Sequence, residues 1–571
     1  MTKIAINRRT LLCGLSSSAA LAWLPRSAAA LEGDLPPGGL QADVVIVGGG
    51  LGGCAAALAA LRGGLSVILT EETDWIGGQL TQQAVPPDEH GWIESHGCTR
   101  SYRELRSGIR EYYRQHYPLT SAARSTVNLN PGSGSVSRLC HEPRVALAVL
   151  QAMLAPYRSG KQLTVLLEHQ AIAADTDGEQ IRELRVISLR SGQQRDLKAP
   201  WFIDATELGD LLPLTGTEYI TGSEARRDTQ ELHAAEEPNP ANQQAFTMCF
   251  AVDHLDGEDH TIDKPAEYDF WREFVPELTP PWPGRLLDLT YTHPPTLQPK
   301  LLGFSPTGQS QSGTLNLWNY RRIADHKNFE PGTYRSDISL INWPQNDYLL
   351  GNLIDVDADE QAAHINRAKQ LSLSLLYWLQ TEAPRPDGGT GWPGLRLRAD
   401  VVGTEDGLAK YPYVREARRI LAEFTVLEEH CGRENRALVT GAEPATVRAA
   451  SYHDSVGIGS YHIDLHPSTG GDNYIDFASL PFQIPLGALL PRRMKNLLPA
   501  AKNIGTTHIT SGCYRLHPVE WSIGEAAGAL IAHCHQHRTW PHAVRNQPAQ
   551  LAEFQESLRR QGLELRWPSD K

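Results

Sequence analysis

Short, fully apolar runs alternate with glycine-rich turns near the start of the chain. Residues 44–47 and 67–69 are continuous Val, Ile and Leu runs, which are typical of strands buried in a parallel sheet. The alanine- and leucine-rich segment 53–62 between them predicts a buried helix. Residues 42–82 are therefore expected to form a first βαβ unit.

The same patterns predict further elements along the chain. Helical spacing is expected over residues 100–117, 142–157, 357–383, 412–425 and 519–533, and strands over residues 163–174, 181–189, 196–199 and 201–204. We therefore predict an α/β fold. It comprises a Rossmann-like nucleotide-binding domain, with a parallel sheet and a β-meander crossover, and an inserted mixed α+β substrate domain.

Changes in amino-acid composition divide the chain into segments. Between residues 216 and 395, Pro, Trp, Asn, His and Gln become frequent and regular patterns become short. We predict a signal peptide at 1–30, a substrate or cap domain at 216–395 and a helical tail at 536–571. The Rossmann-like domain is expected to be split into a first segment at 31–215 and a second segment at 396–535.

Composition narrows the possible partners. The chain has 571 residues, of which 41% are apolar and 21% charged, with a formal net charge of −13. No basic footprint for nucleic acid occurs, and no apolar stretch after the signal is long enough to span a membrane. We expect a small-molecule substrate, no nucleic acid and no membrane span.

The N-terminus has the pattern of a targeting segment. Lys3 and the pair Arg8-Arg9 precede a mildly apolar stretch that ends in the small residues 28–30. The arginine pair resembles a twin-arginine signal, a route that exports folded proteins. We expect a periplasmic or secreted protein that is exported folded.

A glycine fingerprint lies directly behind the first predicted strand. Gly48 permits a tight turn, Gly50 permits backbone approach to a pyrophosphate, and Gly53 permits close helix packing. Leu51 lies at the expected helix N-terminus, which favours an anion. Glu71 follows the second strand and is placed to accept hydrogen bonds from ribose hydroxyls.

The loop after the second strand favours FAD over NAD. Gly77 and Gly78 follow Glu71 closely, and glycines here permit close backbone contact with the longer FAD molecule. A second complete glycine fingerprint for a nicotinamide nucleotide is missing from the sequence, since the segment 457–460 lacks the third glycine.

The chain resembles the FAD-dependent oxidoreductases of the glutathione-reductase type. Two further blocks carry this resemblance: residues 202–210, with Glu207 where Gly is usual, and residues 496–528, with Ala501 where Gly is frequent. The resemblance implies FAD as cofactor, with contacts from Gly48, Gly50, Leu51, Gly53, Glu71, Gly77, Gly78, Thr81, Ala171, Thr206, Gly209, Asp210, Asn503 and Gly505.

Three residues of the C-terminal block are catalytic candidates: His517, Arg515 and His508. Histidine titrates near neutral pH and can act as a base, while Arg515 can bind a carboxylate or a flavin oxygen. The alternative is that these residues only hydrogen-bond the flavin and its loops. The chemistry would then lie elsewhere, at His462 or His466.

Other polar clusters leave alternatives open. His462, Asp464 and His466 alternate on one face of an expected strand, where they could bind a metal or form a wall of the substrate pocket. We favour the wall and expect no metal. The segments 96–100 and 140–142 could supply a covalent flavin link through His or Cys.

These patterns predict an exported FAD-dependent dehydrogenase or oxidase. A small organic substrate would pass a hydride to flavin N5, and electrons would continue to oxygen, a quinone or a carrier such as a cytochrome. An FAD monooxygenase or reductase is an alternative, and a flavin-bearing electron-relay or binding subunit is another. The long insert at 216–395 favours a substrate pocket over a relay.

Overall fold

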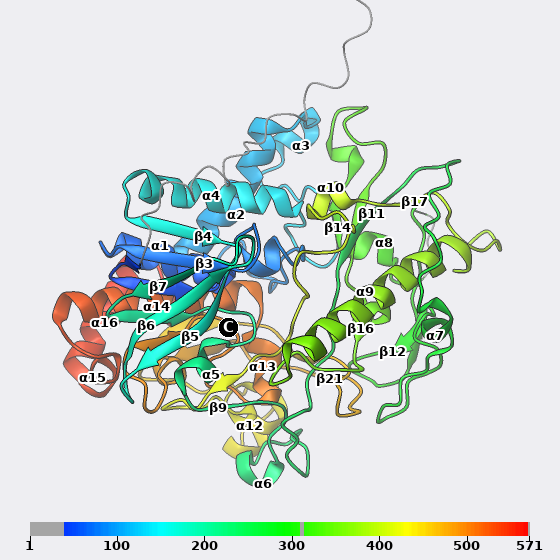
Figure 1. The fold of residues 1–571 in the computed structure, drawn as a ribbon. Helices are drawn as coiled ribbons and strands as arrows, with labels where there is room; N and C mark the ends of the chain where they lie inside the picture. Colours follow the sequence, from blue (N-terminus) through cyan, green and yellow to red (C-terminus); the bar gives the residue numbers. More distant parts are fainter. Residues whose placement is uncertain (1–38, 309–312, 569–571) are drawn as a thin grey trace, which may run out of the picture.

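A five-stranded parallel sheet forms the centre of the nucleotide-binding domain (Figure 1). The computed structural model describes residues 39–308 and 313–568, so the predicted signal peptide lies outside the described residues. The strands run in the order β23 (Leu497–Pro499), β8 (Trp201–Asp204), β2 (Val44–Val47), β3 (Val67–Glu71) and β4 (Leu163–Leu167). The Rossmann-like fold class is therefore confirmed.

Both faces of this sheet are covered, which explains its continuous apolar runs. Val44 and Ile46 of β2 join the core beneath the helices, whereas Val45 and Val47 join the core beneath the second sheet. That second sheet is the predicted meander, with strands in the order β1 (Leu40–Gln41), β7 (Gln194–Lys198), β6 (Ile181–Ser188) and β5 (His169–Thr176).

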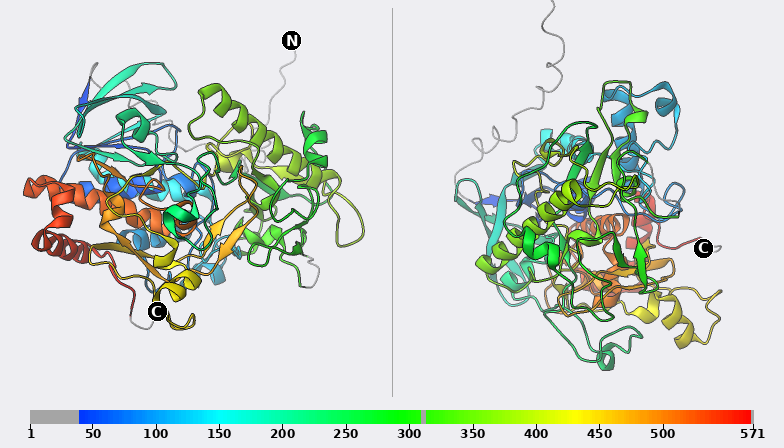
Figure 2. Two further views of the ribbon diagram at one scale, coloured as in Figure 1. Left: turned by 90° about the horizontal axis from the view of Figure 1, so that it is seen from below. Right: turned by 90° about the vertical axis from the view of Figure 1, so that its right-hand side faces the viewer.

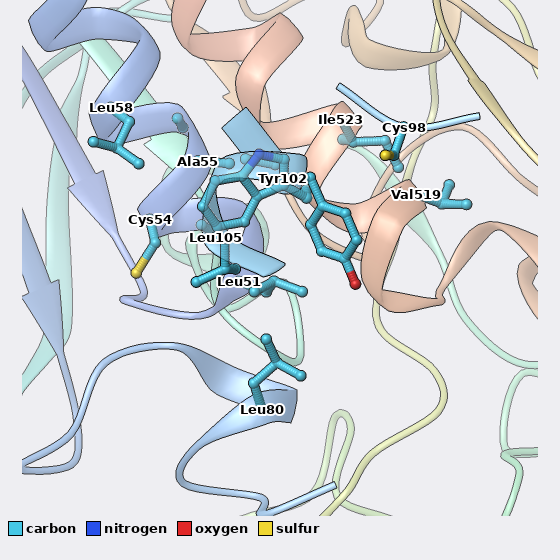
Figure 3. Packing of buried hydrophobic residues seen from close by; sticks show 14 of the residues in the cluster. Leu51, Cys54, Ala55, Leu58, Leu80, Cys98, Tyr102, Leu105, Val519 and Ile523 are labelled. Atoms are coloured by element: carbon cyan, nitrogen blue, oxygen red, sulfur yellow. The ribbon is translucent and has the colours of Figure 1, made fainter. Parts of the chain in front are cut away.

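Helices α1 (Leu51–Arg62) and α14 (His517–His537) lie against each other beneath the parallel sheet. A Cβ on Gly524 would lie 2.0 Å from the carbonyl oxygen of Gly52, and a Cβ on Gly528 would lie 2.2 Å from that of Ala56. Figure 3 shows Leu51 of α1 beside Tyr102 of helix α2 (Arg100–His116), with Val519 and Ile523 of α14 nearby. Because glycine has no side chain at these two positions, the backbones of the two helices approach closely.

Other helices complete the nucleotide-binding domain. Helix α4 (Pro143–Ser159) packs against α2, as the sequence predicts for 142–157. After α13 (His508–Tyr514) and α14, the tail forms α15 (Pro541–Asn546) and α16 (Pro548–Gln561). Thr99 caps α2 by accepting a hydrogen bond from the Tyr102 amide, 3.2 Å away.

The elements of residues 246–397, which we call the cap, gather on one side of the molecule, drawn in green in Figures 1 and 2. Their antiparallel sheet has the order β14 (Arg322–Ala324), β15 (Ile338–Ile341), β11 (Phe250–His254) and β17 (Leu395–Leu397). Helix α9 (Ala358–Thr381) begins at its N-cap Asp357 and buries Leu371, Leu375 and Leu379 in a separate hydrophobic core.

Two element predictions are wrong. Residues 412–425 form no helix; their backbone is extended, and β18 (Arg419–Ile420) pairs with β9 (Tyr219–Ile220). Tyr413 exchanges two backbone hydrogen bonds with Thr247, so pairing with distant segments overrides the local helical spacing. The predicted strand 163–174 is two strands in different sheets, because Glu168 takes a left-handed conformation with φ of 57°.

Within the described ranges, no helix combines the length and apolar character needed to cross a membrane.

Candidate functional site

The predicted glycine turn lies between the ends of β2 and β8. Gly48 has φ of +97°, and a Cβ there would lie 2.2 Å from the carbonyl oxygen of Ala205. Gly50 is the N-cap of α1 and provides no side-chain cap. A Cβ on Gly53 would lie 2.0 Å from the carbonyl oxygen of Gly48. The turn therefore requires glycine at 48 and 53, and Gly50 adds no side chain of its own at the N-terminus of α1.

Glu71 closes the same turn from the end of β3. Its Oε2 accepts a hydrogen bond from the Gly49 amide at 2.9 Å, and its Oε1 accepts one from the Thr73 amide at 2.9 Å. Burial raises the pKa of Glu71 to about 7, although these hydrogen bonds favour the charged form. The two amide donors hold the Glu71 carboxyl group against the glycine turn.

The loop after β3 folds back onto the turn. The Gly77 amide donates to the Gly49 carbonyl oxygen at 2.7 Å, and Thr81 Oγ1 donates to the Ile76 carbonyl oxygen at 2.6 Å. A Cβ on Gly78 would lie 2.9 Å from the Leu51 amide nitrogen. Glycine at this position keeps the first turn of α1 accessible to a ligand.

A cavity opens where these segments meet the turn after β8. Its lining comes from the strand ends and the loops after them: Val47, Gly48, Gly50, Thr70, Glu71, Glu72, Gln82, His169, Ala205, Thr206, Glu207, Asp210 and Tyr411. We call it the nucleotide cavity.

The remaining predicted cofactor residues divide into two groups. Thr206 Oγ1 accepts from the Asp210 amide at 2.7 Å, and both residues line the nucleotide cavity. Asn503 donates to the Asp204 carbonyl oxygen at 3.1 Å and so holds the loop after β23. The described structure does not bring Asn503, Gly209, Gly505 or Ala171 into the cavity lining; Ala171 packs in the core beneath the meander, and His169 of the same strand lines the cavity instead.

The sequence pattern does not reveal a buried charge network beside the turn. Lys502 pairs with Glu207 and lies 3.6 Å from Glu520 Oε2. Glu520 Oε1 accepts from the Gly52 amide at 3.1 Å, and Glu520 also accepts from Gln79. Lys502 thus neutralises carboxylates beside the N-terminus of α1. Its position in the flavin block was visible in the sequence, but its partners come from distant segments.

The residues fit FAD. The helix N-terminus at Gly50 suits a diphosphate, the carboxyl group of Glu71 suits ribose hydroxyls, and Lys502 offsets the nearby negative charge. Glu207 Oε1 has no hydrogen-bond partner within the protein and lies 3.1 Å from a Cβ position on Gly50. A bound ligand with a donor group would satisfy this buried oxygen.

A second cavity, of about 190 Å³, lies between the cap and the nucleotide-binding domain. We call it the cap cavity. The cap contributes Tyr291, Pro294, Leu302, Leu315, Leu317, Tyr320, Arg321, Asn342, Trp343 and Pro344, and the rest of the chain contributes Asp88, Tyr413, Arg415, Tyr461, His462, Asp464, His466, Tyr474, Asp476 and Arg515. Aromatic walls with a few polar groups are typical of small-molecule sites.

The three catalytic candidates occupy different surroundings. Arg515 lines the cap cavity and donates to Asp464 Oδ2 at 3.1 Å. His517 lines neither cavity described above; its Nδ1 accepts from the Asp88 amide at 3.1 Å, and burial lowers its pKa to about 3. His508 is buried against Glu416, with Nδ1 and Oε1 2.5 Å apart. Of the three, the structure brings only Arg515 to the cap cavity.

His462 and His466 both line the cap cavity, on either side of strand β20 (Ile463–Leu465). His462 Nδ1 lies 2.8 Å from Asp476 Oδ1, and the His462 side chain is 41% exposed. His466 Nδ1 lies 2.6 Å from Asp347 Oδ2, which belongs to the cap. These are histidine–carboxylate pairs in which the carboxylate orients the ring.

Neighbouring charges shift the pKa values of His462 and of Asp464 in opposite directions. Burial opposes the imidazolium form of His462, but the hydrogen bond to Asp476 and the charge of Asp464 raise its pKa overall. Burial alone would raise the pKa of Asp464, yet His466 and Arg515 hold it well below its usual range. Asp464 is therefore a fixed negative charge between the two histidines.

The candidates for a covalent flavin link lie apart from both cavities. Burial raises the pKa values of Cys98 and Cys140 to about 12, so both thiols are protonated. Burial lowers the pKa of His141 to about 4. His96 stacks on Trp92, with ring centroids 6.2 Å apart.

The fold, the glycine turn and the nucleotide cavity define an α/β flavoprotein, with a second cavity beneath a cap. The sequence matches the family model described as FAD dependent oxidoreductase over residues 43–558. The chain therefore belongs to the FAD dependent oxidoreductase family, and it is an FAD-dependent enzyme.

Individual relatives are distant. A search of curated proteins finds no match. Among solved structures, a geranylgeranyl bacteriochlorophyll reductase-like protein from Thermoplasma acidophilum is 11% identical over 92% of this chain and 85% of its own, with a TM-score of 0.32. The rebeccamycin biosynthetic enzyme RebC with reduced flavin is 14% identical over 38% of this chain and 39% of its own, with a TM-score of 0.21.

A third structure is the glycerol-3-phosphate dehydrogenase from Bacillus halodurans complexed with FAD. It is 13% identical over 37% of this chain and 40% of its own, with a TM-score of 0.21. The chain spans well under two thirds of the length of this dehydrogenase and of RebC. These distant similarities do not indicate a substrate.

Proposed function

We propose that this protein is a dehydrogenase or oxidase that oxidises a small polar organic molecule in the cap cavity. The observation that carries the proposal is the His462–Asp476 pair, which lines this cavity with one histidine partly exposed. When bound, FAD supplies the two-electron acceptor for a hydride. The chain's own residues then have to bind the substrate and remove a proton.

His462 is the proposed proton acceptor. Asp476 accepts a hydrogen bond from the Nδ1–H of His462, so that the lone pair on Nε2 is free to take a proton from a substrate hydroxyl or amine. The carboxylate of Asp476 then stabilises the imidazolium that forms. The raised pKa of His462 supports this role, because it makes the imidazole a stronger base.

Arg515 and His466 are proposed to orient the substrate. Arg515 is held by Asp464, and His466 is held by Asp347 across the boundary with the cap. Asp347 also pairs with Arg415 at 3.0 Å. These fixed partners support a rigid wall that positions a polar substrate at little entropic cost. The role proposed for His517 is to hold the 85–88 loop rather than to transfer protons.

The destination of the electrons and the location of the protein are also proposals. The sequence offers one nucleotide fingerprint, which supports an acceptor other than a nicotinamide nucleotide: oxygen, a quinone or a cytochrome. Arg8-Arg9 and the small residues 28–30 support export of the folded holoprotein.

Anaerobic reduction of the holoprotein tests the function. Purified protein is mixed with a panel of alcohols, amines and hydroxy acids, and bleaching of the visible flavin band is followed. Reduction by one class, slowed in His462→Ala, is expected. If that class reduced wild type and His462→Ala at equal rates, His462 would be excluded as the base.

A further inference from the structure

We infer that His533, His537 and Glu553 form a binding site for a divalent transition-metal ion of the zinc class. The site lies where the C-terminal end of α14 meets α16. It is separate from both cavities, and it revises the expectation from the sequence that the chain binds no metal.

The geometry brings three ligand types together. His533 and His537 are four residues apart and therefore share one face of α14. Their rings are stacked, with centroids 4.3 Å apart and planes 26° apart. Glu553 of α16 lies 3.8 Å from His537, between Oε1 and Nε2. One ligand atom from each residue lies within 4.8 Å of the others. Two imidazoles and a carboxylate are a known zinc ligand set that leaves one position for water.

The buried side chain of His533 is a second, independent observation that points to a bound ligand. His533 is only 7% exposed, and its Nε2 has no hydrogen-bond partner within the protein. Phe554 packs on the ring with centroids 5.4 Å apart. A metal ion at this point would satisfy a buried nitrogen that otherwise costs stability.

A second cluster in the described residues lacks these properties. Asp325, His326 and Asp337 also lie close together. However, Arg322 donates to Asp325 at 3.1 Å and to Asp337 at 2.8 Å, so its guanidinium already neutralises both carboxylates. No such cation pairs with Glu553 among the ion pairs of the described residues. The α14–α16 cluster is therefore the one with ligands available.

The location implies a structural role. Helix α14 has 21 residues, so His537 lies about 30 Å from the end that begins at His517. The metal would tie α14 to α16, whose Leu551 and Phe554 belong to the main core. We expect the ion to stabilise the tail without changing the rate of flavin reduction.

Metal analysis of the full-length holoprotein tests the site. Protein treated with chelator is incubated with excess zinc, freed of unbound ion by gel filtration and assayed for zinc and FAD. Wild type and the matched control His535→Ala, an exposed histidine of the same helix, should retain one zinc per chain. His537→Ala and Glu553→Gln remove exposed ligands and should weaken zinc binding by more than roughly tenfold.

Two further readouts distinguish a built site from loose surface binding. Cobalt in place of zinc should give the visible absorption of a tetrahedral ion in wild type and in His535→Ala but not in His537→Ala, and zinc should raise the melting temperature of wild type but not of His537→Ala. Retention of no zinc by wild type, or equal retention by wild type and His537→Ala, would overturn the proposal.

Discussion

His462 Nδ1 lies 2.8 Å from Asp476 Oδ1, across the hairpin of β20 and β21 (Ile475–Phe477). The pair lines the cap cavity, which is the proposed substrate site. This single contact links the fold to the proposed chemistry, because it fixes the ring and leaves the second nitrogen free.

Removing the proposed base should slow flavin reduction without loss of cofactor. His462→Ala is expected to lower the rate of anaerobic reduction by roughly 10²–10⁴-fold, since a positioned base contributes that much. Stopped-flow absorbance measures the rate, and the FAD content per chain is measured in parallel. His453→Ala, an exposed histidine outside the cavity, is the control. A wild-type rate in His462→Ala would exclude the role.

The pH profile should report the same residue. A base must be deprotonated to act, so kcat/KM should rise with pH through a pKa above the ordinary histidine value of about 6.5. Asp476→Asn removes a charge that raises this pKa, so the rising limb should move to lower pH while the maximum rate falls. A limb that stays in place would show that another group titrates.

The buried network around Lys502 should be sensitive to the loss of its cation. Lys502→Met leaves Glu207 and Glu520 buried without a positive partner, and we expect a loss of about 3–5 kcal/mol in the free energy of unfolding. The double variant Lys502→Met/Glu207→Gln should recover part of this loss. Denaturant unfolding measures both.

A surface pair provides the control for that experiment. Lys369→Met breaks an exposed pair with Asp406 and should change the free energy of unfolding by less than about 0.5 kcal/mol. A loss in Lys502→Met no larger than in Lys369→Met would mean that the buried carboxylates do not need Lys502.

At the contact between α1 and α14, replacing a glycine by alanine should lower the free energy of unfolding instead of raising it. Replacing glycine by alanine within a helix ordinarily gains about 0.5–1 kcal/mol. Gly524→Ala should instead lose about 1–3 kcal/mol, because its Cβ would lie 2.0 Å from the Gly52 carbonyl oxygen. Gly108→Ala meets only a Val149 side chain and should cost less. A gain in Gly524→Ala would contradict the close packing.

The sequence predicts the features that depend on local rules. The spacing of Gly48, Gly50 and Glu71 depends on one βαβ unit, so the turn, the helix and the acid at the strand end can be predicted together. Helix α2 and helix α9 follow from periodicity and from their caps, Thr99 and Asp357. In each case the residues that carry the pattern lie in the predicted element or directly beside it.

The rest depends on contacts between distant segments. Asp347 meets His466 across 119 residues, and Lys502 meets Glu207 across 295. Residues 412–425 have helical spacing but become extended, because Tyr413 pairs with Thr247. No local pattern encodes such partners, so the cap cavity and its charged wall become visible only in the folded chain.

Anaerobic reduction of the purified holoprotein tests the central claim most directly. The protein is expected to contain one FAD per chain, identified by mass after heat release, and Gly50→Val should lack it. One class of small polar substrate should bleach the flavin in wild type and should do so far more slowly in His462→Ala. Absence of FAD, or a flavin that the same substrate reduces equally in both proteins, would contradict the account.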